Sequence, residues 1–163
     1  MKEQIVVKPA LAIIGVTTRT TNAEEAGPNG RLPALWNAYF GSGIAERTQI
    51  SNGHLIYALY TDYENGASGA YTTLIGHERG SDAVDEMPAG LVQTAVPEAR
   101  YLVFKTKKGP VYEVVAQAWG EIWAYFQNSS LERAYTGDYE LYDGRTFNPE
   151  EAEIEIYIAI KQG

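Results

Sequence analysis

The residues from Asp138 to Asp143 have the sequence DYELYD, which places one carboxylate in the middle of a short strand of aromatic and aliphatic side chains. In a strand, Glu140 and Tyr142 share one face, while Tyr139 and Leu141 take the other. Burying an acid is costly unless something pairs with it, so an acid between tyrosines indicates a site for a cation or a proton. The alternative is an edge strand with Glu140 in water, because glutamate is mostly exposed in folded proteins.

Composition and charge narrow the class of protein. The 163 residues suit a single domain, and the formal charge of −8 arises from 13 basic and 21 acidic residues. The basic residues are scattered, apart from Lys105, Lys107 and Lys108, which argues against direct binding of nucleic acid. The chain has no cysteine and only two histidines, so we expect neither a metal site nor a cofactor.

The remaining composition bears on location and on the kind of partner. No apolar run approaches the length that spans a bilayer, and the N-terminal residues lack the apolar core of a signal peptide. We therefore expect a cytoplasmic protein with no membrane partner. Twelve tyrosines and three tryptophans exceed what a plain core of this size needs. Aromatics with a polar atom are frequent where an apolar partner is both packed and hydrogen-bonded.

The first half of the chain predicts a strand, a helix and a hairpin. The β-branched segment 11–21 is typical of a strand with a bend at Gly15, and a polar loop over 22–30 follows it. From Pro33, apolar residues at helical spacing predict a helix of about four turns. That apolar face, with Phe40 interpreted as core, consists of Leu32, Leu35, Trp36, Tyr39, Phe40 and Ile44. Segments 54–64 and 70–78 are expected to form the hairpin, with His77 in solvent at a strand end.

The second half repeats this order after a connection over 80–90. Strands are expected over 91–95 and 99–106, and again over 135–143 and 153–160. Between the two pairs of strands, Pro110 begins an amphipathic helix with Tyr112 and Trp123 flanking its apolar face. That face consists of Val111, Val115, Ala118, Trp119, Ile122 and Phe126. Two such units, at about 5–80 and 90–161, predict one α+β domain over 1–163, with helices on sheet faces and a cleft at the seam.

Several short motifs, in order along the chain, make it resemble the GyrI-like effector-binding domain, which occurs alone and at the C-terminus of multidrug-sensing transcription regulators. The resemblance covers the chain from about Ala10 to Ile160. Its motifs are Gly15-Val16, Thr18-Arg19-Thr20, Pro33-Ala34-Leu35-Trp36, Tyr57-Ala58-Leu59-Tyr60, Gly69-Ala70-Tyr71, Gly109-Pro110, and Asp138-Tyr139-Glu140-Leu141-Tyr142.

The resemblance implies a pseudo-twofold pair of βαββ units on an antiparallel sheet, with a ligand cleft between the halves. Such domains bind cationic, aromatic or amphipathic compounds. A glutamate that matches Glu140 would neutralise the charge of the ligand, and Tyr142 would accompany it. The side chains implied as aromatic walls are Trp36, Tyr39, Tyr71, Trp119 and Trp123. Regulators of this kind carry an N-terminal helix-turn-helix, whereas here about ten residues precede the first expected strand, so we expect no direct reading of DNA.

Other functions stay open from the sequence. A glutamate with a raised pKa beside a tyrosine could also activate water, so a hydrolase of reactive small molecules is an alternative, and we assign no catalytic residue. A protein-interaction module, similar to relatives that inhibit DNA gyrase, is another alternative, with an unknown protein partner. That function needs the acidic residues on one face, and they are dispersed along the chain. In a purely structural alternative, the aromatics form two ordinary cores.

Overall fold

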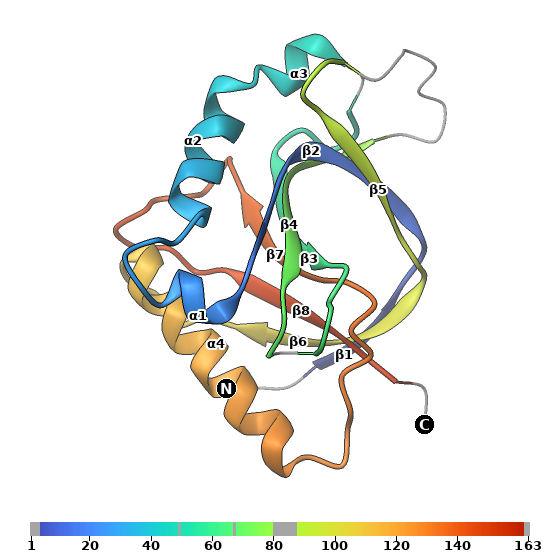
Figure 1. The fold of residues 1–163 in the computed structure, drawn as a ribbon, viewed down its shortest axis with the longest axis vertical. Helices are drawn as coiled ribbons and strands as arrows, with labels where there is room; N and C mark the ends of the chain where they lie inside the picture. Colours follow the sequence, from blue (N-terminus) through green and yellow to red (C-terminus); the bar gives the residue numbers. More distant parts are fainter. Residues whose placement is uncertain (1–3, 49, 67, 80–87, 162–163) are drawn as a thin grey trace.

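The computed structural model describes residues 4–48, 50–66, 68–79 and 88–161. These residues form eight strands and four helices (Figure 1). The strands are Gln4–Lys8 (β1), Leu11–Thr20 (β2), Leu55–Thr61 (β3), Tyr71–Arg79 (β4), Val92–Val96 (β5), Ala99–Lys105 (β6), Asp138–Asp143 (β7) and Glu155–Ile160 (β8). The helices are Asn22–Glu25 (α1), Leu32–Gly41 (α2), Ile44–Arg47 (α3) and Val111–Asn128 (α4).

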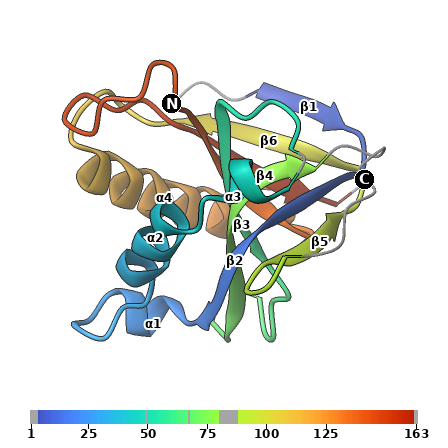
Figure 2. The same cartoon turned by 90° about the horizontal axis from the view of Figure 1, so that it is seen from above.

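All eight strands belong to one antiparallel sheet with the order β1-β6-β8-β7-β3-β4-β2-β5. At its centre β3 pairs with β7, and the order β3-β4-β2 on one side repeats as β7-β8-β6 on the other. Each side contributes a strand, a long helix and two strands, so the predicted α+β fold with a pseudo-twofold pair of βαββ units is confirmed. Figures 1 and 2 show α2 and α4 on the same side of the sheet.

The short strands β1 and β5 join the two halves at the edges of the sheet. Strand β1, which the sequence did not predict, pairs with β6, while β5 pairs with β2. The β1–β6 ladder ends at Lys8 and Ala99, and the β2–β5 ladder begins at Leu11 and Val96. Two residues separate β1 from β2, and two residues separate β5 from β6. Each of these short connections contains a proline, which has no N–H to donate. Each half therefore borrows an edge strand that precedes the other half.

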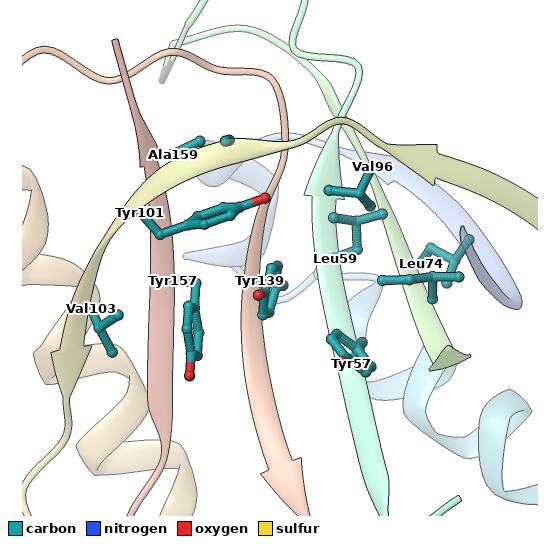
Figure 3. Packing of buried hydrophobic residues seen from close by; sticks show 11 residues of the cluster. Tyr57, Leu59, Leu74, Val96, Tyr101, Val103, Tyr139, Tyr157 and Ala159 are labelled. Carbon is teal, nitrogen blue, oxygen red and sulfur yellow. The ribbon is translucent and has the colours of Figure 1, made fainter. Parts of the chain in front are cut away.

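The sheet face away from the helices carries its own apolar core, which is rich in tyrosine (Figure 3). Its buried members are Ile13, Tyr57, Leu59, Leu74, Val96, Ala99, Tyr101, Val103, Tyr139, Tyr157 and Ala159. The rings of Tyr139 and Tyr157 stack with their centroids 4.7 Å apart. All of its buried members are strand residues, and Tyr139 serves packing on the face opposite Glu140, as the period-2 pattern predicts.

Two glycines let β2 and β4 approach closely. Gly15 faces Gly76 in the ladder, and a Cβ on Gly76 would lie 1.9 Å from the carbonyl oxygen of Ile14. A Cβ on Gly15 would lie 2.1 Å from the carbonyl oxygen of Ile75. A side chain at either position would force the strands apart, which explains why glycine occupies both.

The structure corrects several boundaries. The helix expected up to Ile44 ends at Gly41, because Gly43 takes a left-handed conformation (φ 61°) and α3 starts as a separate turn. The loop expected over 22–30 contains α1, since the Thr21 hydroxyl accepts a hydrogen bond from the backbone N–H of Glu24 and caps it. Phe40 is 70% exposed, so its interpretation as core is wrong. Most of the connection expected over 80–90 lies outside the described residues.

Candidate functional site

Glu140 lies near the centre of the sheet, on the face that carries the helices. In β7 it faces Ala58 of β3 on one side and Ile156 of β8 on the other. Both neighbours belong to apolar clusters beneath the helices. Only 3% of Glu140 is exposed, so the alternative of an edge-strand glutamate in water is wrong.

Three neutral donors hold the Glu140 carboxylate. The Tyr60 hydroxyl and the Trp119 indole N–H donate to Oε2 at 2.7 and 2.8 Å. The Tyr142 hydroxyl donates to Oε1 at 2.6 Å. Within the described part of the chain, no lysine, arginine or histidine forms an ion pair with this carboxylate. Glu140 is therefore a buried acid that is hydrogen-bonded but has no cationic partner.

Burial and hydrogen bonding determine the protonation states of Glu140, Tyr60 and Tyr142. Burial raises the pKa of Glu140, while hydrogen bonds from Tyr142, Trp119 and Tyr60 act in the opposite direction. The pKa values of Tyr60 and Tyr142 are raised well above the ordinary value, first by burial and then by the nearby Glu140 charge. Both phenols therefore keep their protons and remain donors. The carboxylate is balanced between a charged form that the donors favour and a neutral form that burial favours.

Further aromatic rings surround the three donors. Trp36 of α2 packs edge-on against Tyr142 with ring centroids 5.1 Å apart. Trp119 packs edge-on against Tyr60 at 5.4 Å and lies 6.2 Å from Trp123. Trp36 and Trp119 are half-buried, and Trp123 is 40% exposed. The structure thus brings Trp36, Trp119 and Tyr142 together around Glu140, with Trp123 on the outer side of Trp119.

Tyr39, one of the expected aromatic walls, forms a hydrogen bond with His77. Its hydroxyl lies 2.7 Å from Nε2 of His77, while Nδ1 of His77 lies 2.9 Å from the Leu55 carbonyl oxygen. Burial lowers the pKa of His77, so the neutral ring donates from Nδ1 to Leu55 and accepts at Nε2 from Tyr39. His77 is only 4% exposed, so its expected place in solvent is wrong. Tyr39 reaches the Glu140 site through its ring contact with Trp36.

Tyr71 and Tyr60 lie side by side beyond Glu140. Tyr71 is 4% exposed, and its ring centroid is 5.7 Å from that of Tyr60. Tyr60 is part of one motif of the family resemblance, but it was not among the expected site residues. Tyr60 shares a strand face with Ala58, which faces Glu140 across the β3–β7 pair. Only the strand pairing, which the sequence did not give, reveals this contact.

Asp138, two residues before Glu140, shows what a satisfied buried acid looks like in this protein. It is fully buried, and its Oδ2 lies 2.6 Å from Nη2 of Arg133. Oδ2 also accepts from the Tyr63 hydroxyl at 2.6 Å, and Oδ1 accepts from the backbone N–H of Ala159 at 2.8 Å. These contacts tie the segment before β7 to β8. Asp138 therefore has a structural partner for its charge, whereas Glu140 has none.

Neither of two hollows on the protein is lined by Glu140 or by any of its three donors. One of about 400 Å³ is lined by Lys105, Asp143 and Phe147 among others, and one of about 210 Å³ by Tyr39, His77 and Glu46 among others. A ligand can reach Glu140 only when the side chains that cover it shift, because its exposed fraction is 3%. The cleft between the halves therefore stays a prediction.

The described ranges contain no group of three or more histidine, cysteine, aspartate or glutamate side chains that could hold a metal ion. None of their helices is long and apolar enough to cross a membrane.

The fold is that of a small-molecule-binding domain. The sequence model of the GyrI-like small molecule binding domain matches residues 1–161, so the chain belongs to the GyrI-like family, and the resemblance is confirmed. A relative from Bacillus subtilis (strain 168), named "Putative transcriptional regulator protein YobU", is 35% identical over 149 residues, which is 91% of each chain.

Two solved structures have similar folds. The integron cassette protein VCH_CASS2 from the mobile metagenome of Vibrio cholerae is 28% identical, with a TM-score of 0.78 over 98% of this chain and 95% of its own. SAV2435 bound to tetraphenylphosphonium is 17% identical, with a TM-score of 0.77 over 99% and 94%. At that identity, the likeness to SAV2435 shows the shared fold alone.

Proposed function

We propose that this domain binds cationic, aromatic or amphipathic small molecules, with Glu140 as the counter-charge and the surrounding rings as the walls. The proposed role is drug sensing or transcription regulation in the cytoplasm. The observation that carries the proposal is a 3%-exposed carboxylate with three neutral donors and no cationic partner in the described part of the chain. The relation to YobU supports the regulatory role, and the tetraphenylphosphonium bound to SAV2435 supports the class of ligand.

The energetic argument starts from the missing counter-charge. A cation about 5 Å from Glu140 gains about 3 kcal/mol at an effective dielectric constant of about 20. Each tryptophan or tyrosine face that it touches adds about 0.5–2 kcal/mol. Association and desolvation offset part of this gain, so affinities around the micromolar range are expected. Flat rings and a single charge distinguish poorly between similar cations, which suits a sensor of many compounds.

The test is calorimetric titration with tetraphenylphosphonium and with neutral triphenylphosphine oxide. The Glu140→Gln variant should bind the cation at least about tenfold more weakly, a loss of about 1.4 kcal/mol, and the neutral compound almost unchanged. Glutamine preserves the local geometry, because its amide oxygen can accept from Tyr60 and Trp119 while its NH₂ donates to the Tyr142 oxygen.

The matched control is Glu121→Gln, which removes the same charge from an exposed position on α4. Its affinity for tetraphenylphosphonium should equal that of the parent protein. If Glu140→Gln and the parent bind the cation equally well, or if both glutamine variants lose the same affinity, the proposed role of Glu140 is refuted.

One observation favours a second candidate function, a hydrolase of reactive small molecules. Burial raises the pKa of Glu140, and two tyrosine hydroxyls contact its oxygens, which are features of a general acid or base. Incubation with strained-ring electrophiles such as epoxides separates the two functions. Turnover that disappears in Glu140→Gln supports the hydrolase, whereas saturable binding without turnover supports the sensor.

A further inference from the structure

Thr73 carries a buried hydroxyl without a partner. It lies in β4 with 1% of its surface exposed, and its Oγ1 has no hydrogen-bond partner among the described residues. It alternates with Ile75, which packs beneath α2, so it belongs to the sheet face that carries the helices. An unpaired buried hydroxyl costs about 1–3 kcal/mol, so one in the middle of a sheet requires an explanation.

The neighbours of Thr73 place this hydroxyl next to the Glu140 site. In the β3–β4 ladder Thr73 faces Tyr60, and the hydroxyl of Tyr60 donates to Glu140. Two residues before Thr73 on the same face lies Tyr71, whose ring packs against that of Tyr60. The hydroxyl groups of Tyr60, Thr73 and Tyr71 therefore form a row of polar groups, here called the polar surface, that runs from Glu140 across β3 to β4.

At the far end of this surface lies a second carboxylate, that of Glu25 on α1. Its Oε2 accepts from the Thr20 hydroxyl at 2.6 Å, and Thr20 faces Tyr71 directly in the β2–β4 ladder. Both oxygens also accept backbone N–H groups at the start of α2, from Arg31 at 2.8 Å and Leu32 at 3.1 Å. Glu25 is thus fixed in place beside Tyr71.

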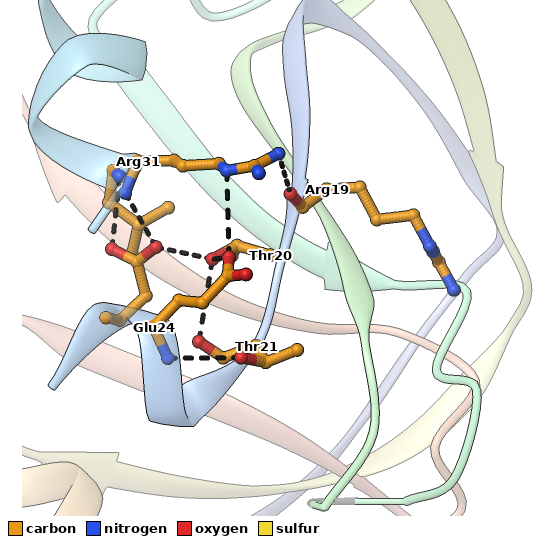
Figure 4. Close-up of polar contacts among 7 residues, drawn as sticks. Arg19, Thr20, Thr21, Glu24 and Arg31 are labelled. Carbon is orange, nitrogen blue, oxygen red and sulfur yellow. Dashed lines mark hydrogen bonds and ion pairs between the residues drawn. The ribbon is translucent and has the colours of Figure 1, made fainter. Parts of the chain in front are cut away.

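The cationic side chains near Glu25 are engaged with other groups (Figure 4). The guanidinium of Arg31 lies 3.6 Å from the Glu24 carboxylate and donates to the Arg19 carbonyl oxygen at 3.0 Å. The guanidinium of Arg19 donates to the Asp62 carbonyl oxygen and to Thr72. Across the described residues, no cationic side chain forms an ion pair with Glu25.

Tyr71 lies within the field of both acids. Burial raises its pKa first, and the charges of Glu25 and Glu140 raise it further. Its phenol therefore stays protonated between two carboxylates that both lack an ion pair in the described part of the chain. A positive group placed beside this phenol would be attracted from both sides.

We infer that the ligand site continues from Glu140 past Tyr60 and Thr73 to Tyr71 and Glu25, and that it takes elongated aromatic dications. One cationic centre lies at Glu140, and a second, N–H-bearing centre lies at the end formed by Thr73, Tyr71 and Glu25. An amidinium or ammonium group there supplies the partner that the Thr73 hydroxyl lacks. This inference rests on the proposed function, because it extends the same site.

The test compares three probes that differ in charge and in N–H groups. Tetraphenylphosphonium has one charge and no N–H, 4-alkoxybenzamidine has one amidinium, and pentamidine has two. The parent protein should bind pentamidine at least about tenfold more tightly than the monoamidine. In Thr73→Val this preference should fall about threefold or more, with the affinity for tetraphenylphosphonium unchanged.

The variants separate a binding role from a folding role. Valine has nearly the shape of threonine and removes an unpaired group, so Thr73→Val should fold at least as stably as the parent. Thr17→Val, which changes the opposite face of β2, should leave all three affinities unchanged. Glu25→Gln should also reduce the preference for pentamidine, although it alters the start of α2 as well.

Each outcome decides a different claim. Binding of tetraphenylphosphonium without a preference for pentamidine overturns this inference and leaves the proposed function intact. Equal losses of both ligands in Thr73→Val overturn it too. If the parent protein binds no cation at all, the proposed function fails and the extended site fails with it.

Discussion

Two acids in one strand should respond in opposite ways to the loss of their charge. Asp138 and Glu140 are both buried, but only Asp138 has an arginine partner, Arg133, at 2.6 Å. Removing one member of a buried ion pair leaves the other charge uncompensated, which costs about 3–5 kcal/mol. For a domain of this size, Asp138→Asn should therefore lower Tm by about 6–20 °C.

Glu140→Gln should cost little or even stabilise the fold. Tyr60 and Trp119 can still donate to the amide oxygen, Tyr142 can accept from the amide NH₂, and no cation is left unpaired by the change. The pKa of Glu140 is raised in the folded state, so its ionised form lowers stability at pH values above the ordinary value of 4.5. The free energy of unfolding of this variant at pH 7 should lie within about 1 kcal/mol of that of the parent, or above it.

Urea denaturation at pH 7, followed by tryptophan fluorescence and by circular dichroism, measures both effects. Coincident transitions would justify the two-state analysis. A loss of about 3 kcal/mol or more in Glu140→Gln, equal to that of Asp138→Asn, would mean that Glu140 has a cationic partner after all. That result would refute the contrast on which the site rests.

Three further changes probe the surroundings of the site. Trp119→Phe removes an N–H that favours the ionised Glu140, so the pH below which cation binding weakens should rise, as titration calorimetry at several pH values would show. Because burial lowers the pKa of His77, the unfolded chain binds a proton there at a pH where the folded chain does not. The free energy of unfolding should therefore fall as the pH drops below about 6.5. In urea titrations at several pH values, His77→Gln should make this dependence on pH weaker. Gly76→Ala, whose Cβ would meet a backbone oxygen of β2, should cost about 2–4 kcal/mol in thermal denaturation, whereas Gly120→Ala in open space on α4 should cost nothing.

The sequence predicted most of the repeating architecture because each signal was local. Alternating isoleucines marked β8, and apolar residues at helical spacing together with Pro110 marked α4. The strand β1 was missed because its five residues depend on pairing with β6, which lies far along the chain. The break between α2 and α3 was missed because the conformation of Gly43 overrides a continuous apolar pattern.

The candidate site was predictable in part for the same reason. The period-2 pattern placed Glu140 and Tyr142 on one face, and the structure shows them in contact. Tyr60 went unassigned because it reaches Glu140 only through the pairing of β3 with β7. Thr73 went unassigned because only the pairing of β3 with β4 places it beside Tyr60. His77 was misplaced because its acceptor role depends on Tyr39, a helix residue that no local pattern links to it.

The most direct test of the central claim is the titration of the Glu140 carboxyl carbon by carbon-13 NMR, with and without tetraphenylphosphonium. The free protein should show a pKa above the ordinary value of 4.5, because burial without a cationic partner disfavours the charge. A bound cation should lower that pKa, since it stabilises the ionised form. A pKa that stays the same when the ligand saturates the protein would contradict the account.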